Sequence, residues 1–202
     1  VNYDDLVVIG NKPAWLAALQ AQHANVLVLD ANSNVETIKS AVAPLQEKAK
    51  AAGKVLPVLL TAPVMPTDSN ALVDTVNAAI KPVLASARAL VAGSDSTNPV
   101  RLWCVSENAY GSDNINLAAY PQLGFAKGMA LEAGELWGGI LDVSGSADEQ
   151  AAAITAELNG QTPEDAVKYA GAVRSVLRLQ SDRPAQTSLS NLNDKATYLV
   201  TG

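Results

Sequence analysis

LVVIGNKPAWLAALQ, residues 6–20, is the stretch of sequence that decides the fold. Its first five residues form an apolar run closed by a glycine, which is typical of a buried parallel strand. Pro13 stands where a helix can begin, because the first helical position needs no backbone N–H. Trp15, Leu16 and Leu19 then follow at helical spacing. We therefore expect a strand that turns into a helix, the repeating unit of an α/β protein.

The same unit repeats along the chain. Further strands are predicted at residues 25–30, 55–62, 100–106 and 138–143, and helices at 33–50, 69–91, 122–132 and 148–158. Ser33 and Glu36 predict a capping box, and Pro82 predicts a kink or a division of the 69–91 helix. Two short alternating runs around Ala170 and Gly171 predict a hairpin over 165–179. The sequence thus predicts an α/β fold with a mostly parallel, Rossmann-like sheet and helices on both faces.

Three segments are expected along the chain. Residues 1–180 carry the strand and helix patterns and form the folded unit, whereas residues 181–195 are polar, lack periodicity and are predicted to be a linker. The last stretch, ATYLVTG (196–202), has the pattern of a buried strand that runs into a turn at Thr201 and Gly202. In a dinucleotide-binding domain, such a strand is followed by a glycine-rich loop and a helix.

Composition excludes several classes of protein. Of the 202 residues, 49% are hydrophobic and only 4% aromatic, so aliphatic side chains must fill the core. A net charge of −6 disfavours nucleic-acid binding, which needs a basic face. The chain has no apolar run of about 20 residues and starts without the pattern of a signal peptide. Its single cysteine, Cys104, fits a reducing compartment, and we expect a cytoplasmic protein.

The first turn lacks the features of a dinucleotide site. Such a site needs several glycines, so that the backbone can approach the pyrophosphate at a helix N-terminus. Gly10 stands alone, and Pro13 and Trp15 occupy positions where small residues belong. Asp30, about twenty residues further on, could mimic the acid that binds a ribose, but acids commonly end strands. We therefore predict that this part of the chain binds no cofactor.

The residues that a short-chain reductase uses for catalysis are also not in place. Its Tyr donates a proton to the carbonyl oxygen and has its pKa lowered by a Lys four residues later. Four residues after Tyr120 comes Gly124, and Lys127 is seven residues away. Pro121 suggests that Tyr120 precedes the helix, and Ser106, at a strand end, is expected to be structural. We predict that Tyr120 and Lys127 are surface or interface residues and that the chain has no catalytic residue.

Other kinds of active site find no support in the sequence. His23 is the only histidine and follows a predicted helix, where a helix C-terminal cap is the simpler role. No G-x-S-x-G turn accompanies it. Cys104 lies in an apolar strand and is predicted to be a buried thiol. No cluster of Cys, His and acidic residues has the spacing of a zinc site, so no metal is predicted.

One region carries a likeness to a known family. The strand VRLWCVSENAY (100–110) and the following PQLGFAKGMALEAGELWGGILDV (121–143) resemble the structural subdomain of ketoreductases from modular polyketide synthases. In that family an LWxVT strand precedes a helix that opens with Pro-Gln, continues with a Gly-hydrophobe-x-Arg/Lys element and ends with Ala-Leu-Glu. Leu-Trp-Gly-Gly then leads into a strand with Asp. These elements lie here at residues 102–106, 121–122, 124–127, 130–132, 136–139 and 141–142.

The resemblance implies a division of labour between two halves. Residues 1–180 would be a truncated, nucleotide-free Rossmann-like subdomain, related to short-chain dehydrogenases/reductases, that packs against and stabilises a catalytic subdomain. That catalytic half uses NADPH and a Ser/Tyr/Asn/Lys set to reduce a β-ketoacyl group held on an acyl carrier protein. No member of this set is carried over. Residues 196–202 resemble the first strand of the catalytic half, and Thr201 and Gly202 match only the threshold of its cofactor site.

The sequence departs from the family pattern in ways that leave alternatives open. The usual Thr-Arg after the LWxV strand is replaced by Ser106 and Glu107, which suggests an altered contact with the catalytic half or a pseudo-ketoreductase that supports a neighbouring enoylreductase or methyltransferase. A free-standing NAD(P)-dependent oxidoreductase would need Gly10 and Asp30 to bind a ribose. A module that docks the carrier protein is disfavoured by the acidic charge, since carrier proteins are themselves usually acidic.

Overall fold

A seven-stranded sheet forms the centre of the protein. The computed structural model describes residues 3–91, 99–111, 114–160, 164–181, 193 and 195–199. The strand order is β2-β1-β3-β4-β5-β6-β7, with every pair parallel except β6 and β7. The strands are β1 (Leu6–Ile9), β2 (Val26–Leu29), β3 (Leu56–Thr61), β4 (Val100–Glu107), β5 (Trp137–Ser144), β6 (Ala166–Ala170) and β7 (Val173–Val176).

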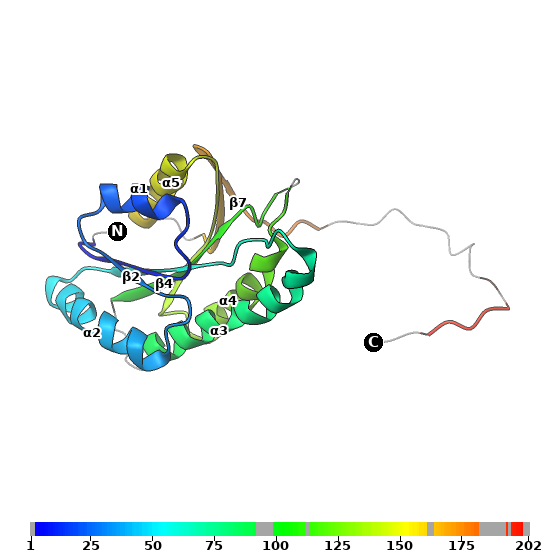
Figure 1. Ribbon diagram of the computed structural model, residues 1–202, viewed down its shortest axis with the longest axis horizontal. Coiled ribbons are helices and arrows are strands. Elements are labelled where there is room, and N and C mark those ends of the chain that lie inside the picture. The colour runs from blue at the N-terminus through cyan, green and yellow to red at the C-terminus, as the bar shows by residue number, and fades with distance from the viewer. Residues whose placement is uncertain are drawn as a thin grey trace.

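Helices cover both faces of this sheet, as Figure 1 shows. One face carries α1 (Trp15–Gln22) and α5 (Ala147–Asn159), which pack against each other, and the other carries α2 (Val35–Ala52), α3 (Leu72–Val91) and α4 (Tyr120–Glu132). Short 3₁₀ helices, η1 (Ser69–Ala71) and η2 (Leu117–Ala119), precede α3 and α4. The predicted Rossmann-like α/β fold is therefore confirmed. No helix in the described parts of the chain is long and apolar enough to cross a membrane.

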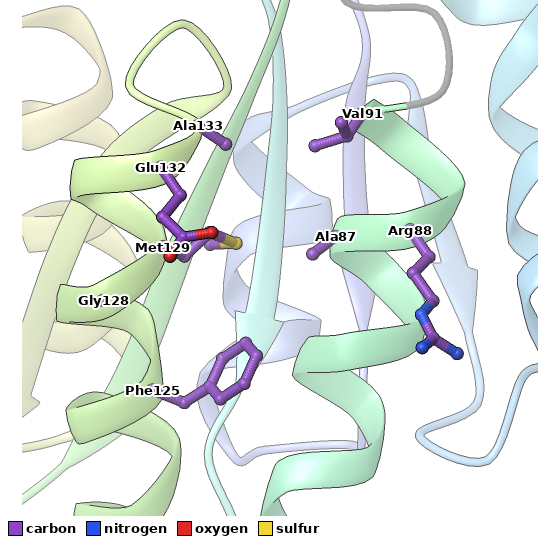
Figure 2. A pocket seen from close by; sticks show the side chains of 8 residues that line it. All are labelled: Ala87, Arg88, Val91, Phe125, Gly128, Met129, Glu132 and Ala133. Atoms are coloured by element: carbon purple, nitrogen blue, oxygen red, sulfur yellow. The ribbon is translucent and has the colours of Figure 1, made fainter.

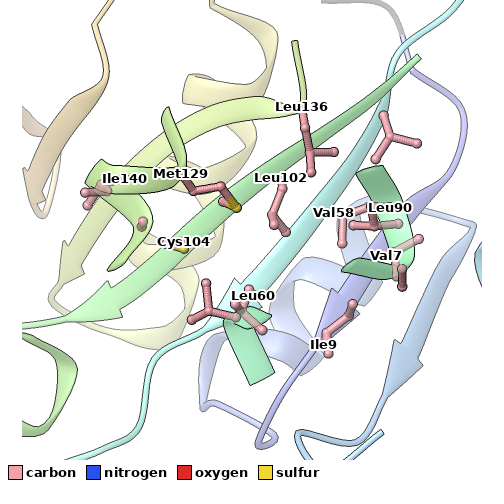
Figure 3. Packing of buried hydrophobic residues seen from close by; sticks show 14 of the residues in the cluster. Val7, Ile9, Val58, Leu60, Leu90, Leu102, Cys104, Met129, Leu136 and Ile140 are labelled. Atoms are coloured by element: carbon pink, nitrogen blue, oxygen red, sulfur yellow. The ribbon is translucent and has the colours of Figure 1, made fainter. Parts of the chain in front are cut away.

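Alternate residues of the strands fill two aliphatic cores. Figure 3 shows the larger one, beneath α2, α3 and α4, where β1, β3 and β4 contribute Val7, Ile9, Val58, Leu60 and Leu102. Their neighbours along each strand face α1 and α5 on the other side. The period of two explains why the central strands β1 and β3, which are covered on both sides, are apolar on both faces.

The chain reverses direction in the sheet between β1 and β3. It leaves β1 through α1 to β2, then returns through α2, on the opposite face, to β3 on the other side of β1. In open α/β sheets, ligands bind at such a switch point, outside the carboxyl ends of the strands. A full dinucleotide fold carries a further strand beyond the second one. Among the described strands β2 is the edge of the sheet, and none of them lies beyond it.

Pro57 lies within β3, a central strand, where proline is ordinarily excluded. The N–H groups of Leu56 and Ala62 donate to β4 and its flank, so the odd-numbered residues of β3 turn their nitrogens toward β1. Pairing between β1 and β3 begins only at Val7 and Val58. The nitrogen of Pro57 therefore faces the β1 side before that ladder starts, and no bond is lost.

Two predicted helix features need correction. The cap of α2 is Asn34, whose side chain accepts a hydrogen bond from the Thr37 N–H at 2.9 Å, so the capping box of Ser33 and Glu36 is wrong. Tyr120 is the first residue of α4 and does not precede it, since Pro121 occupies the first turn, where no N–H is needed. Pro82 lies inside α3 without dividing it. The predicted hairpin is confirmed as β6 and β7.

The expected segments at the C-terminus fall largely outside the described residues. This holds for most of the 181–195 linker and for Thr201 and Gly202. The described residues 196–199 form no strand, and Leu199 is 90% exposed. The sequence assigns the strand expected there to a second subdomain, which would supply its pairing partner, so this assignment stays a prediction.

Candidate functional site

The switch point between β1 and β3 is closed by a side chain. Gly10 follows β1 with a φ of +142°, and a Cβ built on it would collide with the Thr61 Oγ1. The Thr61 hydroxyl also donates to the Asn11 carbonyl at 3.4 Å. A dinucleotide fold leaves the space beside this glycine for the pyrophosphate. Here Thr61 occupies that space and Pro13 lacks an N–H, so these residues do not fit a pyrophosphate.

Replacing Gly10 with alanine should therefore destabilise the protein. The added methyl group must displace Thr61, and the alanine must keep a φ that L residues rarely adopt. We therefore expect the free energy of unfolding, measured by urea denaturation, to fall by about 2 kcal/mol. Gly53→Ala is the control, since Gly53 also has a positive φ, +62°, but nothing within 4 Å of its Cβ position. That change should cost only about 1 kcal/mol. Equal losses in the two variants would contradict the close contact with Thr61.

A small cavity remains beside this turn. It has a volume of about 220 Å³ and is lined by residues of the loops after β1, β2 and β3 together with α3 and α4, among them Asn11, Asn32, Thr61 and Gln122. Asp30 lies just before this loop, but its Oδ1 accepts the Asn32 N–H at 2.7 Å, so it supports its own turn. The described residues that line the cavity are all neutral, so none of them offers a cationic side chain to a phosphate.

The carboxyl ends of β4 and β5 hold a buried acid. Asp142 is 0% exposed, and its Oδ1 accepts hydrogen bonds from the Ser106 hydroxyl and the Ala109 N–H, both at 2.8 Å. Its Oδ2 accepts the Tyr110 N–H at 2.9 Å. Three donors thus satisfy the carboxylate, which anchors the loop after β4. The hydrogen bond to Asp142 gives Ser106 the structural role that the sequence predicts.

The tyrosines near this acid are arranged unlike those of a reductase. The Tyr120 hydroxyl donates to the Ala109 carbonyl at 2.9 Å, and its ring meets that of Tyr110 edge-on, with centroids 6.5 Å apart. Lys127 is exposed on α4. Burial, and then the charge of Asp142, raises the pKa of Tyr110 to about 12. A reductase needs a tyrosine whose pKa is lowered, so Tyr110, whose pKa is raised, does not fit that role.

Glu107, the other departure from the family pattern, is half-buried at the end of β4. Burial raises its pKa, a hydrogen bond with Gln150 lowers it, and the charge of Asp142 raises it further. The side chain thus interacts with an amide and lies near another acid. These surroundings disfavour an anionic ligand.

Cys104 is a buried thiol, as predicted. Burial raises its pKa to about 12, partly offset by a hydrogen bond with Gln122.

At pH 8 only about one Cys104 thiol in ten thousand would be the reactive thiolate. We expect iodoacetamide at pH 8 to leave the native protein unlabelled over hours and to label it fully in urea, as mass spectrometry would report. Rapid labelling of the folded protein would contradict the buried position.

His23 caps the C-terminus of α1, as predicted, but it also links two helices. Its Nε2 lies 3.0 Å from the Thr155 Oγ1 on α5, and burial lowers the pKa of its imidazole. Its ring packs near Tyr3, with centroids 5.6 Å apart. No group of three or more His, Cys, Asp or Glu in the described ranges could hold a metal ion.

An apolar groove runs between α3 and α4 on the outer surface. It has a volume of about 460 Å³, and Figure 2 shows Phe125 and Met129 of α4 pointing toward Ala87 and Val91 of α3. Arg88 and Glu132 stand at its borders. The groove continues along an exposed apolar stripe on α3, made of Val73, Ile80, Leu84 and Val91, which repeats at helical spacing.

The sequence alone does not indicate the residues that matter most here. Asp142 stands in it only as part of the family motif, and nothing in the sequence distinguishes Thr61. The one available signal for the groove was the spacing of apolar residues around α3, which exceeds what a single buried face requires.

Comparisons with known proteins support the Rossmann-like fold and the likeness to polyketide synthases. No protein-family model matches the chain. It is 33% identical over 122 residues to a subunit of the phenolphthiocerol/phthiocerol polyketide synthase of Mycobacterium tuberculosis, an alignment that covers 57% of this chain and 8% of that protein. The chain thus spans a small part of its relative's length.

Solved structures share the fold. The first ketoreductase of the tylosin polyketide synthase superposes with a TM-score of 0.61 at 18% identity, covering 84% of this chain and 37% of that one. An A1-type ketoreductase gives a TM-score of 0.59 at 21% identity, covering 86% and 38%. A short-chain dehydrogenase from Streptomyces avermitilis gives 0.54 at 13% identity, covering 83% and 89%. The chain therefore has the Rossmann-like fold of polyketide synthase ketoreductases and short-chain dehydrogenases, and over half of its length it resembles a polyketide synthase subunit in sequence.

Proposed function

We propose that the chain is the noncatalytic structural subdomain of a polyketide synthase ketoreductase. It packs against a catalytic half that reduces β-ketoacyl groups on an acyl carrier protein with NADPH, and it stabilises that half in a cytoplasmic multidomain synthase. The single observation that carries this proposal is the exposed apolar stripe and groove of α3 and α4, on a Rossmann-like unit whose own switch point is filled by Thr61.

The outer face of α2, another long helix on the same side of the sheet, differs from this surface. The exposed side of α2 carries charged residues, among them Glu36, Lys39 and Glu47. On α3, by contrast, Val73 is 65% exposed and Ile80 39%. An exposed apolar surface of this kind marks a contact site, and each Å² of it that a partner covers contributes about 25 cal/mol. A neighbouring subdomain is the partner that the resemblance implies.

The cofactor and the catalytic groups would then belong to the partner half. The tyrosine near Asp142 has a raised pKa, and the turn after Gly10 does not fit a pyrophosphate. Neither observation depends on the family resemblance, and both support a scaffold over a reductase. In the whole synthase, NADPH would supply the hydride to the β-ketoacyl group, while the residues of this chain hold the neighbouring half in place.

Removing the scaffold tests the proposal directly. The parent protein is expressed with and without residues 1–180, and the soluble yield and ketoreductase activity of the catalytic segment are compared. We expect the segment alone to aggregate or lose most of its activity, because an apolar surface about as large as the α3–α4 face would become exposed. Equal solubility and activity without residues 1–180 would show that no scaffold is needed.

Point substitutions test which surface makes the contact. Val91→Lys together with Phe125→Lys, introduced into the parent protein, should lower its ketoreductase activity at least about tenfold and reduce its soluble yield, because two charges enter a desolvated apolar contact. Val173→Lys is the control, since Val173 is also exposed, at 65%, but lies on β7. Soluble yield and activity are measured for the parent protein and for both variants. Unchanged yield and activity in the α3–α4 variant would place the contact elsewhere.

Two alternatives give different results in the same preparations. A pseudo-ketoreductase scaffold would stabilise a neighbouring enoylreductase or methyltransferase, so the deletion would affect that activity and leave ketoreduction unchanged. A free-standing oxidoreductase would bind NADPH by itself, near Gly10 and Asp30. Titration of the chain with NADPH, followed by nicotinamide fluorescence, should show no saturable signal if the scaffold proposal is correct.

A further inference from the structure

The outer edge of the sheet is β2, which pairs with β1 alone among the described strands. The Leu6 N–H donates to the Asn25 carbonyl and the Gly10 N–H to the Leu29 carbonyl, each at 3.0 Å. In a parallel ladder, alternate residues turn their backbone groups toward the same neighbour. Residues 25, 27 and 29 therefore face β1, and the N–H and C=O groups of Val26 and Val28 point outward.

Nothing in the side chains of β2 protects this edge. Its sequence, VLVL, has no charge, no proline and no bulge, three of the devices that natural edge strands use against pairing. All of its side chains are partly exposed: Val26 and Val28 border the core under α1 and α5, and Leu27 and Leu29 border the core under α2. The edge is thus incomplete in both its backbone pairing and its apolar packing.

The other edge of the sheet, β7, is built differently. It belongs to an antiparallel hairpin, alternates exposed and partly buried residues, and carries Arg174, whose guanidinium forms an ion pair with Glu157 of α5. A long cationic side chain and a polar neighbour, Ser175, interrupt its apolar surface. Of the two edges of the described sheet, only β2 is apolar along its whole length, as a contact surface would be.

We propose that β2 is the edge through which two copies of this chain associate, by antiparallel pairing of the two β2 strands around a two-fold axis. The axis passes beside Leu27, which places Val26 opposite the partner subunit's Val28 so that both outward-facing residues exchange N–H to C=O bonds. Residues directly opposite then lie on the same side of the joined sheet, as pleating requires. Val26, Leu27 and Val28 each gain an apolar neighbour directly across the seam, and Leu29 lies opposite the partner's Asn25.

Charge and symmetry favour a second copy as the occupant. Antiparallel pairing places the Asp30 carboxylates at opposite ends of the seam, so no acid stands directly opposite another. A two-fold contact closes on itself, whereas pairing of β2 with β7 of the next copy would continue without end and form fibres. The contact area is small, so association should depend on protein concentration, and salt should strengthen it by screening the net charge of −6 on each copy.

Amide hydrogen exchange, read residue by residue by NMR, tests the pairing without any substitution. In a concentrated sample the amides of Val26 and Val28 should be protected, and dilution by about a hundredfold should raise their exchange rates at least about tenfold. The amides of Leu27 and Leu29 face β1 and serve as internal controls that should not change. Sedimentation equilibrium on the same samples reports the mass.

A pair of variants separates backbone pairing from simple contact. Val28→Pro removes an outward N–H at an edge, where proline is tolerated, and should weaken dimerisation at least about tenfold. Val28→Thr keeps the N–H and the branched shape and should dimerise nearly as well. Rapid exchange of Val26 and Val28 at every concentration would overturn the proposal. Slow exchange of these two amides in a monomeric sample would also overturn it. The same holds if dimers persist while these two amides exchange rapidly.

Discussion

Asp142→Ala is expected to lower the free energy of unfolding by about 4 kcal/mol, the largest effect that we predict for a single substitution. Asp142 is fully buried, and its carboxylate accepts hydrogen bonds from the Ser106 hydroxyl and from the N–H groups of Ala109 and Tyr110. Alanine would leave these three donors without an acceptor, and each buried unpaired donor costs about 1–3 kcal/mol. The loop after β4 would also lose its anchor on β5.

Urea denaturation measures the effect, since the midpoint should fall while the slope stays constant for a two-state transition. Asp142→Asn keeps the shape and one acceptor oxygen but places an amide donor against one of the N–H groups, so its loss should be intermediate, about 2 kcal/mol. Asp148→Ala is the control, because Asp148 is exposed in the first turn of α5 and should cost no more than about 0.5 kcal/mol. A loss of less than about 1 kcal/mol for Asp142→Ala would contradict the role of this anchor.

Much of the fold could be predicted because its signals are local. The apolar runs at residues 6–10, 25–30 and 100–106 become β1, β2 and β4 within one or two residues, and Gly53 ends α2 as expected. Buried parallel strands need continuous apolar sequence, and the helices between them need a period of 3.6, so composition and spacing suffice. The parallel order then follows from the alternation of the elements.

Features that depend on neighbouring segments could not be predicted. Ser33 and Asn34 are both good caps, and what decides between them is that α2 must turn Ile38 and Val42 into the core. Nothing local distinguishes Asp142 from a solvated acid at a strand end. Two of its three donors come from a loop more than thirty residues earlier, which includes Asn108 at a φ of +56°.

The contacts of the candidate site also depend on segments that are distant in the sequence, so they could not be predicted. The isolated Gly10 indicated a missing dinucleotide cradle, but not that Thr61, from the end of β3, fills its place. The contact between these residues crosses the switch point of the sheet, so it appears only once β1 and β3 are paired. The α3 stripe was likewise invisible as a surface until the core-facing side of that helix was known.

The second large effect on stability is expected in the hairpin formed by β6 and β7. Arg174 of β7 forms a bidentate pair with Glu157 of α5, from Nε to Oε2 at 2.8 Å and from the second guanidinium nitrogen to Oε1 at 2.9 Å. The Tyr169 hydroxyl donates to Oε2 at 3.0 Å. The Glu157 side chain is 3% exposed and that of Arg174 is 30% exposed, so the carboxylate depends on this cation for its charge balance.

Arg174→Ala should therefore cost about 3 kcal/mol, because it leaves a buried carboxylate without its counter-charge. The exposed pair of Arg178 and Glu164 is the matched control, and Arg178→Ala should cost much less, since solvent screens that pair. Urea denaturation measures the loss in the free energy of unfolding for both variants. Similar losses in the two variants would mean that burial of Glu157 does not set the cost.

The double variant Glu157→Gln with Arg174→Met separates charge from packing. Glutamine keeps an acceptor for the Tyr169 hydroxyl, and methionine covers the same apolar surface without a charge, so most of the stability lost in Arg174→Ala should return. Recovery to within about 1 kcal/mol of the unmodified protein would identify the unpaired carboxylate as the source of the loss. If the double variant were no more stable than Arg174→Ala, the hairpin would depend on the ion pair itself.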